Sequence, residues 1–190
     1  MMPLENPFIH ESAIVDPDVR IGDGSKVWHF SHIMSGASIG VGCVLGQNVF
    51  IGSQVQVGDR CKIQNNVSVV TGVTLANDVF CGPSAVFTNV LTPRCGVSRL
   101  DEFLPTVVEE GVTIGANSTI VCGVTLGRYC FIGAGSVVTK SVTAQALVIG
   151  NPAHYAGWMC VCGERLDDEL LCHRCASRYR CSDNSIQLIK

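Results

Sequence analysis

Residues 9–87 decide the fold, and written six at a time they read IHESAI VDPDVR IGDGSK VWHFSH IMSGAS IGVGCV LGQNVF IGSQVQ VGDRCK IQNNVS VVTGVT LANDVF CGPSAV F. The first residue of every group is apolar, from Ile9 to Phe87. Because 47% of the chain is apolar, chance would give this run in one preset phase about 3 times in 100,000. The fifth residue of each complete group is small or β-branched. A period of six indicates a repeat protein.

The period also predicts the shape of the repeat. Six residues make one short strand and one corner, so three groups close a triangular coil, and successive coils stack in parallel register. The large apolar residue fills the inside of each face and the small one fits at the corner. Glycine often follows the apolar residue, as at Gly22 and Gly52, and we expect it to supply backbone freedom. We therefore predict an all-β parallel solenoid. A β-sandwich has no reason to hold one six-residue phase this long.

A long insertion divides the repeat. The pattern stops after Phe87 and resumes at Val108, continuing through Ile114, Ile120, Leu126, Ile132, Val138 and Ala144. Residues 88–107 contain two prolines and several charged residues, and this segment is too long for a corner. Long loops in compact domains are usually functional. The two blocks together predict seven coils, which at about 4.8 Å per coil form a prism roughly 34 Å tall.

The composition changes after the turn at Gly150-Asn151-Pro152-Ala153. We expect a solenoid domain over residues 1–157 and a cysteine-rich tail over residues 158–190. The tail holds two pairs of closely spaced cysteines, Cys160, Cys162, Cys172 and Cys175. Such pairs are typical of a structural zinc site with four thiolates and no open position. The alternatives are spare thiols or a disulfide. Because so short a tail has almost no core, metal would be its main source of order.

Composition excludes several classes of function. The formal net charge is −3 and basic residues form no run, which argues against a nucleic-acid partner. The first residues lack the basic and apolar regions of a signal peptide. No apolar run approaches the roughly 18 residues of a membrane span. Four of the 11 cysteines (Cys43, Cys61, Cys81 and Cys130) fall at inward repeat positions and are expected to be reduced core residues. We therefore expect a cytoplasmic protein without a membrane partner.

The outward residues form columns along the edges of the predicted prism. One column contains Glu11, His29, Gln47, Asn65, Pro83, Ala116 and Ala134, and the next contains Pro17, Ser35, Ser53, Thr71, Asn89, Cys122 and Lys140. The first column is polar in the lower coils and small in the upper ones. The lower and upper parts of this column therefore present different surfaces to a ligand. Trp28 and Phe30 are expected to pack against another subunit or to stack on a base.

Several short motifs resemble one enzyme family. VWHFSH at 27–32, IQNNV at 63–67, VFCGP at 79–83 and FTNV at 87–90, with Pro93-Arg94, resemble the nucleotide-linked 3-amino-sugar N-acetyltransferases. The chain is most similar to UDP-2-acetamido-3-amino-2,3-dideoxy-glucuronate N-acetyltransferases of bacterial O-antigen synthesis, over roughly residues 9–159. The resemblance implies a left-handed parallel β-helix, a homotrimer, acetyl-CoA as co-substrate and active sites between subunits. Leu100 departs from the family's Arg-Lys-Asp-Glu segment, which leaves the sugar open.

The resemblance and the columns together assign roles to residues. Asn89 is expected to orient the sugar amine. Substrate binding is assigned to His29, His32, Gln47, Asn65, Asn66, Arg94 and Arg99. Coenzyme binding is assigned to Ala116, Ala134, Lys140, Asn151 and Pro152, with His154 as a further contact for the charged end of the coenzyme. An asparagine at a corner is also a common structural choice. The family resemblance is the reason to prefer a catalytic role for Asn89.

Neither His29 nor His32 is expected to be a catalytic base. His29 lies ten hexads before Asn89, which is about 16 Å along the prism axis. Three other functions remain as alternatives. They are an N-acyltransferase for a dTDP-3-amino-deoxyhexose, a carbonic-anhydrase-like zinc enzyme, which would need three converging histidines, and a non-enzymatic solenoid. A donor with a longer acyl group also remains open.

Overall fold

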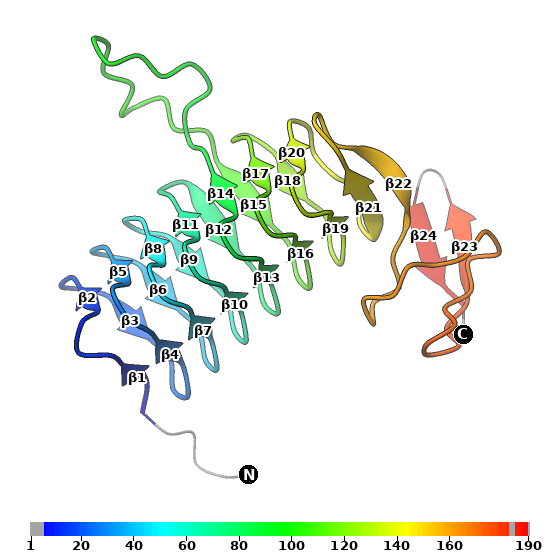
Figure 1. Cartoon of the computed structure of the whole chain (residues 1–190), viewed down its shortest axis with the longest axis horizontal. Coiled ribbons are helices and arrows are strands. Elements are labelled where there is room, and N and C mark those ends of the chain that lie inside the picture. The colour runs from blue at the N-terminus through cyan, green and yellow to red at the C-terminus, as the bar shows by residue number, and fades with distance from the viewer. Residues whose placement is uncertain (1–5, 183–184, 190) are drawn as a thin grey trace.

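The computed structural model describes residues 6–182 and 185–189 and shows a three-sided β-solenoid followed by a small tail (Figure 1). Strands one coil apart pair in parallel with a spacing of 18 residues, as in Val27 with Leu45 and Ile33 with Ile51. The described residues contain strands and turns but no helix, and hence no helix that is long and apolar enough to cross a bilayer. The predicted all-β solenoid is confirmed.

The solenoid consists of three sheets, one for each face of the prism. Sheet A contains β1 (Phe8–Ile9), β4 (Lys26–Val27), β7 (Val44–Leu45), β10 (Lys62–Ile63), β13 (Phe80–Cys81), β16 (Thr113–Ile114), β19 (Phe131–Ile132), β21 (Ala146–Ile149) and the antiparallel β22 (His154–Trp158). Sheet B contains β2 (Ile14–Val15), β5 (His32–Ile33), β8 (Phe50–Ile51), β11 (Ser68–Val69), β14 (Val86–Phe87), β17 (Thr119–Ile120) and β20 (Val137–Val138). Sheet C contains β3 (Arg20–Ile21), β6 (Ser38–Ile39), β9 (Gln56–Val57), β12 (Val73–Leu75), β15 (Thr106–Val108) and β18 (Thr125–Leu126).

The core is the column that the repeat predicts. The first residue of each hexad is buried from Val27 through Val138, and the small fifth residues beside them are buried from Ser25 upward. The Ser25 and Ser31 hydroxyls donate to the carbonyls of Gly40 and Gly46, so the corner serines are satisfied inside the prism. Cys43, Cys61, Cys81 and Cys130 are free and buried, as expected. Burial raises the pKa of the Cys81 thiol to about 12, which keeps it protonated.

The prediction for the last coil was wrong in its phase. Val142, not Ala144, stands above Leu126, and β21 pairs with β19 at a spacing of 16 residues. The chain omits two residues from this turn, so the inward position moves two residues earlier. Because β21 begins a further turn on sheet A, the solenoid also extends beyond the seven coils expected.

The corner glycines have a different role from the one predicted. The left-handed backbone at each corner belongs to the fourth residue of the hexad, which has positive φ at every sixth position from Asp18 to Ser84. The glycine two positions earlier, as at Gly82, is not among the residues with positive φ. A Cβ atom on Gly82 would lie 2.6 Å from the backbone nitrogen of Ala116 and 2.8 Å from the carbonyl oxygen of Ile114. Glycine is therefore required here for the close approach of two coils.

We expect Gly82→Ala to destabilise the solenoid by about 1–3 kcal/mol, because the new methyl group must push two backbones apart. The measurement is the midpoint of urea unfolding. Gly96→Ala is the matched control, since a Cβ atom at Gly96 meets no atom within 4 Å and φ there is not positive. A Gly82→Ala midpoint equal to that of the control would contradict the explanation.

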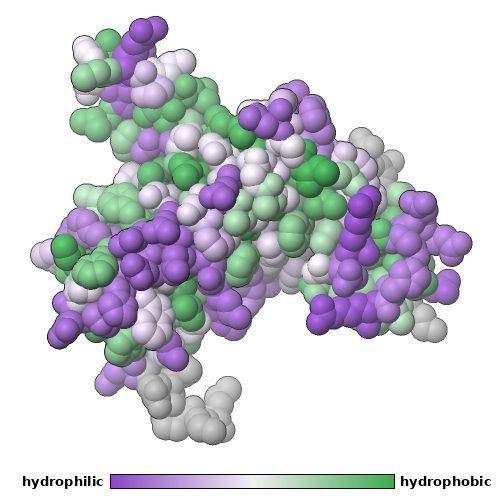
Figure 2. All heavy atoms as spheres, viewed as in Figure 1, coloured by the Kyte–Doolittle hydropathy of each residue, from purple (hydrophilic) through white to green (hydrophobic). Residues whose placement is uncertain are grey.

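The inserted segment projects from the prism between β14 and β15 (Figure 1), and Figure 2 shows both hydrophobic and hydrophilic residues on it. β15 begins at Thr106, so the strand includes the last two residues of the segment predicted over 88–107. Two backbone hydrogen bonds position the end of the segment where it rejoins the prism. Leu104 N donates to Asn89 O at 2.9 Å, and Thr106 N donates to Gly72 O at 3.0 Å. The residues on either side of the loop are therefore held by the solenoid.

The tail begins where β22 leaves sheet A. It ends in the two-stranded hairpin of β23 (Tyr179–Ser182) and β24 (Ser185–Leu188). Its own core is small and contains Cys160, Leu166, Cys172, Tyr179 and Ile186. Trp158 packs against both this cluster and the solenoid core, so the predicted boundary between residues 157 and 158 falls inside β22.

Candidate functional site

Two edges of the prism carry the predicted site residues. The first edge follows the strands of sheet A and the second edge follows the strands of sheet B. His29, Gln47, Asn65, Ala116 and Ala134 lie on the first edge, whereas Asn89 and Lys140 lie on the second. Equivalent residues of successive coils stack directly above one another. On the second edge, for example, Phe87 pairs with Ile120 and Ile120 with Val138.

The lower part of the first edge is hollowed. A surface cavity of about 280 Å³ lies there, lined by Trp28, His29, Val44, Gly46, Gln47, Gln64 and Asn65. The predicted polar residues are thus brought together, and sequence reasoning had not assigned Gln64. The His29 ring stacks on His10, with centroids 3.5 Å apart, and this contact fixes one face of the ring.

Asn65 and Asn66 are partly occupied by structural bonds. Asn65 Oδ1 accepts a hydrogen bond from the backbone nitrogen of Gln47 at 2.9 Å. Asn77 Oδ1 accepts the same kind of hydrogen bond from the backbone nitrogen of Asp59 on another edge, so the contact is a recurring structural feature of the repeat. The amide nitrogen of Asn65 makes no hydrogen bond to the described residues and can donate to a ligand. Asn66 has φ 61° and its Oδ1 accepts from Asn48 at 3.2 Å, which makes it chiefly a corner residue.

His32 does not share the first edge. It lies on β5 and faces outward from sheet B, where its Nε2 is 3.0 Å from Asp16 Oδ1 and its ring meets the edge of Phe50. About a third of each side chain in this pair is exposed (38% for His32 and 29% for Asp16). His29 and His32 therefore lie on different faces of the lowest coils and are separate groups.

Asn89 follows β14, where the inserted segment leaves the second edge. Its Nδ2 lies 3.4 Å from the carbonyl oxygen of Thr71, one coil below. The amide nitrogen is directed at protein, which leaves Oδ1 as a free acceptor. Asn89 is not among the residues with positive φ, so left-handed backbone does not explain an asparagine here. This finding weakens the structural interpretation of the residue.

The arginines of the inserted segment differ from each other. Arg99 donates two hydrogen bonds from Nη1 to the carboxylate of Glu102, at 2.9 and 2.6 Å. Its charge is therefore already compensated. Arg94 is exposed and forms a β-bridge with Val97 through the backbone. Asn89, Arg94 and Arg99 share one segment, but Arg99 is not a free cation.

The upper coils offer backbone groups and a larger cavity. Ala116 and Ala134 carry no long side chain, and a Cβ atom on Gly115 would lie 2.5 Å from Ala134 N, so backbone meets backbone there. Lys140 lines a cavity of about 670 Å³ at the end of the solenoid, together with His154. Asn151 and Pro152 are exposed in the turn between β21 and β22, joined by a cis peptide bond.

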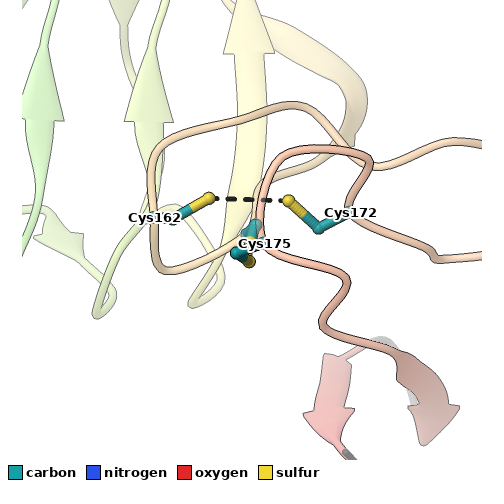
Figure 3. A group of neighbouring side chains, drawn as sticks. Cys162, Cys172 and Cys175 are labelled. Carbon is teal, nitrogen blue, oxygen red and sulfur yellow. Dashed lines mark hydrogen bonds between the residues drawn. The ribbon is translucent and has the colours of Figure 1, made fainter.

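The four tail cysteines form a single cluster. The sulfur atoms of Cys160, Cys162, Cys172 and Cys175 all lie within 4.8 Å of one another. Figure 3 shows three of these side chains, with Cys162 and Cys172 pointing toward each other. Cys162 Sγ is 3.5 Å from Cys172 Sγ, and Cys160 Sγ is 3.5 Å from Cys175 Sγ. Among the residues that the structure describes, this is the one group of three or more side chains suited to a metal ion.

Comparison with known proteins identifies the repeat. The bacterial transferase hexapeptide family (six repeats) matches residues 18–53, 42–77 and 105–140. A dTDP-3-amino-3,6-dideoxy-alpha-D-galactopyranose 3-N-acetyltransferase of Aneurinibacillus thermoaerophilus is 39% identical over 189 residues, covering 97% of both chains. The chain belongs to the hexapeptide-repeat acyltransferase family. Membership confirms the predicted enzyme class, and the non-enzymatic solenoid is no longer an alternative.

Solved structures agree with this assignment. A hexapeptide-repeat acetyltransferase of Vibrio cholerae O1 biovar eltor, complexed with acetyl coenzyme A, has a TM-score of 0.52 and 25% identity, covering 82% of this chain and 72% of that one. The acetyltransferase domain of PglB from Neisseria gonorrhoeae FA1090 shares the fold, with a TM-score of 0.50 and 22% identity over 80% of this chain and 58% of that one.

Sequence reasoning missed part of the acyltransferase's upper cavity. Tyr155, Trp158, Cys181 and Ser185 also line it. The residues come from β22 and from the tail hairpin, which lie outside the hexapeptide pattern. No period predicts where the tail folds back, so the sequence carries no signal for this wall.

Proposed function

We propose that this acyltransferase moves the acetyl group of acetyl-CoA to the 3-amino group of a nucleotide-linked amino sugar. The observation that carries the proposal is the relative of 39% identity, which is named for this reaction and matches along nearly the whole of both chains. Three features of the candidate site support the proposal. They are the polar hollow on the first edge, Asn89 beside the inserted loop, and Lys140 in the upper cavity.

The reaction needs a neutral amine aimed at a thioester carbon. The amine lone pair attacks the carbonyl carbon, and collapse of the tetrahedral intermediate breaks the carbon–sulfur bond. The amine loses its proton late, to the departing sulfur, which gives an amide and free CoA thiol. Asn89 Oδ1 accepts from the amine and points its lone pair at the carbon, while Thr71 O holds the other end of the amide. No histidine is required as a base.

The donor is supported by geometry at the upper coils. The solved acetyltransferase of 25% identity holds acetyl-CoA. In this chain, backbone groups at Ala116 and Ala134 are free of bulky side chains and suit the pantetheine amides. Lys140 stands two strand spacings above Asn89, or about 10 Å along the axis, and offers a cation to the phosphates.

Positions 99 and 100 of the inserted segment favour a neutral acceptor sugar, and Arg94 is the exposed basic residue that the segment retains. Arg99 is bound by Glu102, and Leu100 occupies the position of the family's lysine, so neither provides a free charge for a uronate carboxylate. We therefore propose a dTDP-3-amino-deoxyhexose ahead of UDP-2-acetamido-3-amino-2,3-dideoxy-glucuronate. The carbonic-anhydrase-like alternative finds no support, because the described metal-ligand candidates are cysteines and not three histidines.

Release of CoA thiol tests the function directly. Purified protein is incubated with acetyl-CoA and, in separate reactions, the dTDP-linked and UDP-linked 3-amino sugars and their 3-hydroxy counterparts. Thiol release with an amino sugar but not with its 3-hydroxy counterpart is the expected result. Release with neither amino sugar, in folded protein, contradicts the proposed function. Faster turnover of the uronate than of the neutral sugar contradicts only the choice of acceptor.

We expect His29→Ala to raise KM for the sugar nucleotide about tenfold with little change in kcat, because His29 lines the hollow three coils below Asn89. His32→Ala should behave similarly but more weakly, since His32 is bound to Asp16 on the next face. Steady-state kinetics at saturating acetyl-CoA measures both. A thousandfold loss of kcat with unchanged KM in either variant would restore a histidine base.

We propose that the active unit is a homotrimer with sites between subunits. The two edges that carry the site residues are separate edges of one prism, and a neighbouring copy would bring the missing edge to each. Exposed apolar side chains on sheet B and the inserted loop, such as Ile14, Val86 and Leu100, support burial against another copy. Light scattering is expected to give three times the chain mass, and a stable monomer at micromolar concentration contradicts this.

We also propose that the cysteine cluster holds structural zinc. Four thiolates about 2.3 Å from a tetrahedral zinc ion lie about 3.8 Å apart. The sulfur separations of 3.5 Å, with none above 4.8 Å, fit this geometry. Zinc bound by four thiolates has no open position, so it supplies order to the tail and takes no part in acyl transfer.

A further inference from the structure

The cavity of about 670 Å³ at the end of the solenoid has walls from two parts of the molecule. One wall is the end of the solenoid, which contributes Lys140 and Ser141. The other wall is the strand β22 with the tail hairpin, which contributes His154, Cys181 and Ser185. In Figure 1 the hairpin of β23 and β24 stands beside the last coil, next to β22. The tail hairpin therefore completes one side of a cavity whose remaining lining belongs to the last turn of the solenoid and to β22.

The walls have the chemistry of a site for a phosphorylated nucleoside. Lys140 and His154 are the basic groups, and Ser141 and Ser185 add hydroxyl donors. The rings of Tyr155 and Trp158 meet edge to face with centroids 5.2 Å apart, which offers aromatic surface. Although the chain carries 16 acidic against 13 basic residues, no carboxylate is among the lining residues in the described ranges. An anion is thus favoured over a cation here.

The cysteine cluster connects the two parts of the second wall, β22 and the tail hairpin. β22 runs directly into Met159 and Cys160, and Met159 is anchored to the solenoid by two hydrogen bonds with Gln145 (2.7 and 3.1 Å). The hydroxyl of Tyr179 lies 3.2 Å from Cys160 Sγ and accepts from Val161 N at 3.2 Å. Tyr179 is the first residue of β23, two positions before Cys181 in the cavity wall.

We propose that metal bound by the tail cysteines controls the affinity of this cavity for the phosphorylated adenosine end of the coenzyme. The inference rests on the proposed function, because it takes the ligand from there. The mini-core of the tail has five buried residues, and Cys160 and Cys172 are two of them. Loss of the metal releases β23 and β24, and the cavity then loses the Cys181 and Ser185 wall. Metal and coenzyme are therefore linked ligands, and each strengthens the binding of the other by the same factor.

The test measures the effect of metal on coenzyme binding and of coenzyme on metal binding, using the whole 190-residue chain. CoA and adenosine 3′,5′-diphosphate are titrated calorimetrically into zinc-loaded protein, chelator-treated protein and chelated protein resupplied with zinc. We expect chelation to weaken both ligands at least tenfold and zinc to restore them. In the reverse direction, saturating CoA should slow the transfer of zinc to a chromophoric chelator. Cys175→Ser should reproduce the chelated state, while Cys95→Ser, which alters an exposed cysteine outside the cluster, should bind as the unmodified protein does.

Each result has one meaning. Equal CoA affinity with and without zinc, in protein whose circular dichroism shows an intact solenoid, overturns the linkage and leaves the proposed function in place. Weakened binding of CoA but not of adenosine 3′,5′-diphosphate overturns the placement of the adenosine end in this cavity. Failure of zinc-loaded protein to bind CoA overturns both the linkage and the proposed function.

Discussion

Asn89→Ala is expected to lower kcat by 10²–10³-fold at saturating concentrations of both substrates, with KM for the sugar nucleotide within about threefold of the unmodified protein. The reason is that Asn89 acts on the geometry of attack and contributes little to ground-state binding. Its Nδ2 is directed at Thr71 O, so its Oδ1 is a fixed acceptor for one amine hydrogen. Removal of one preorganised polar contact to the reacting group costs this order of magnitude in enzymes of acyl transfer. Steady-state kinetics by thiol release measures the change.

Asn77→Ala is the matched control for this variant. Asn77 occupies the same third position of its hexad on another edge, and it accepts a backbone hydrogen bond from Asp59. The control should lose some stability but keep kcat within about twofold. If Asn89→Ala retains full kcat, or if Asn77→Ala loses as much, Asn89 is only a corner residue and the amine is oriented by another group.

Much of the solenoid follows from the sequence because every hexad obeys one local rule. The inward column from Val27 to Val138 is buried as the period requires, since side chains at one phase of a parallel solenoid must share one environment. Backbone freedom was the wrong reason for the glycines that follow the inward residues. From the sequence alone, a glycine required for positive φ looks the same as one required for the close approach of two coils. Gly82 illustrates this, since the corner's positive φ is carried by Ser84 instead.

Less of the candidate site follows from the sequence, because the site depends on contacts between columns. The repeat places Asn65 outward but does not reveal that its Oδ1 is taken by the Gln47 backbone. It places His29 and His32 in one hexad but hides that they face different sheets. The slip at Val142 and the tail wall at Cys181 lie where the period ends, so no pattern constrained them.

Removal of the metal is expected to unfold the tail while the solenoid stays intact. We expect one zinc per chain by elemental analysis of protein purified without chelators. After chelation, amide hydrogens of residues 160–182 and 185–189 should exchange at nearly unprotected rates, whereas β4 to β20 keep their protection. The physical reason is size: a segment of this length buries too little apolar surface to fold alone, and its core includes two of the proposed ligands, Cys160 and Cys172. The solenoid core contains none of the proposed ligands, and the partly buried Trp158 packs against both it and the core of the tail.

Two cysteine variants separate a metal site from a general need for thiols. Cys172→Ser removes a fully buried ligand and should lose zinc and tail protection together, whereas Cys181→Ser changes an exposed thiol of the same tail outside the cluster and should keep both. The competing interpretation is a pair of disulfides, Cys160 with Cys175 and Cys162 with Cys172, because each pair of sulfur atoms is 3.5 Å apart. Disulfides would give protein that is four mass units lighter, carries no zinc and resists chelation. Since thiolates must be reduced to bind zinc, the two states exclude each other, and intact mass measured beside zinc content decides between them.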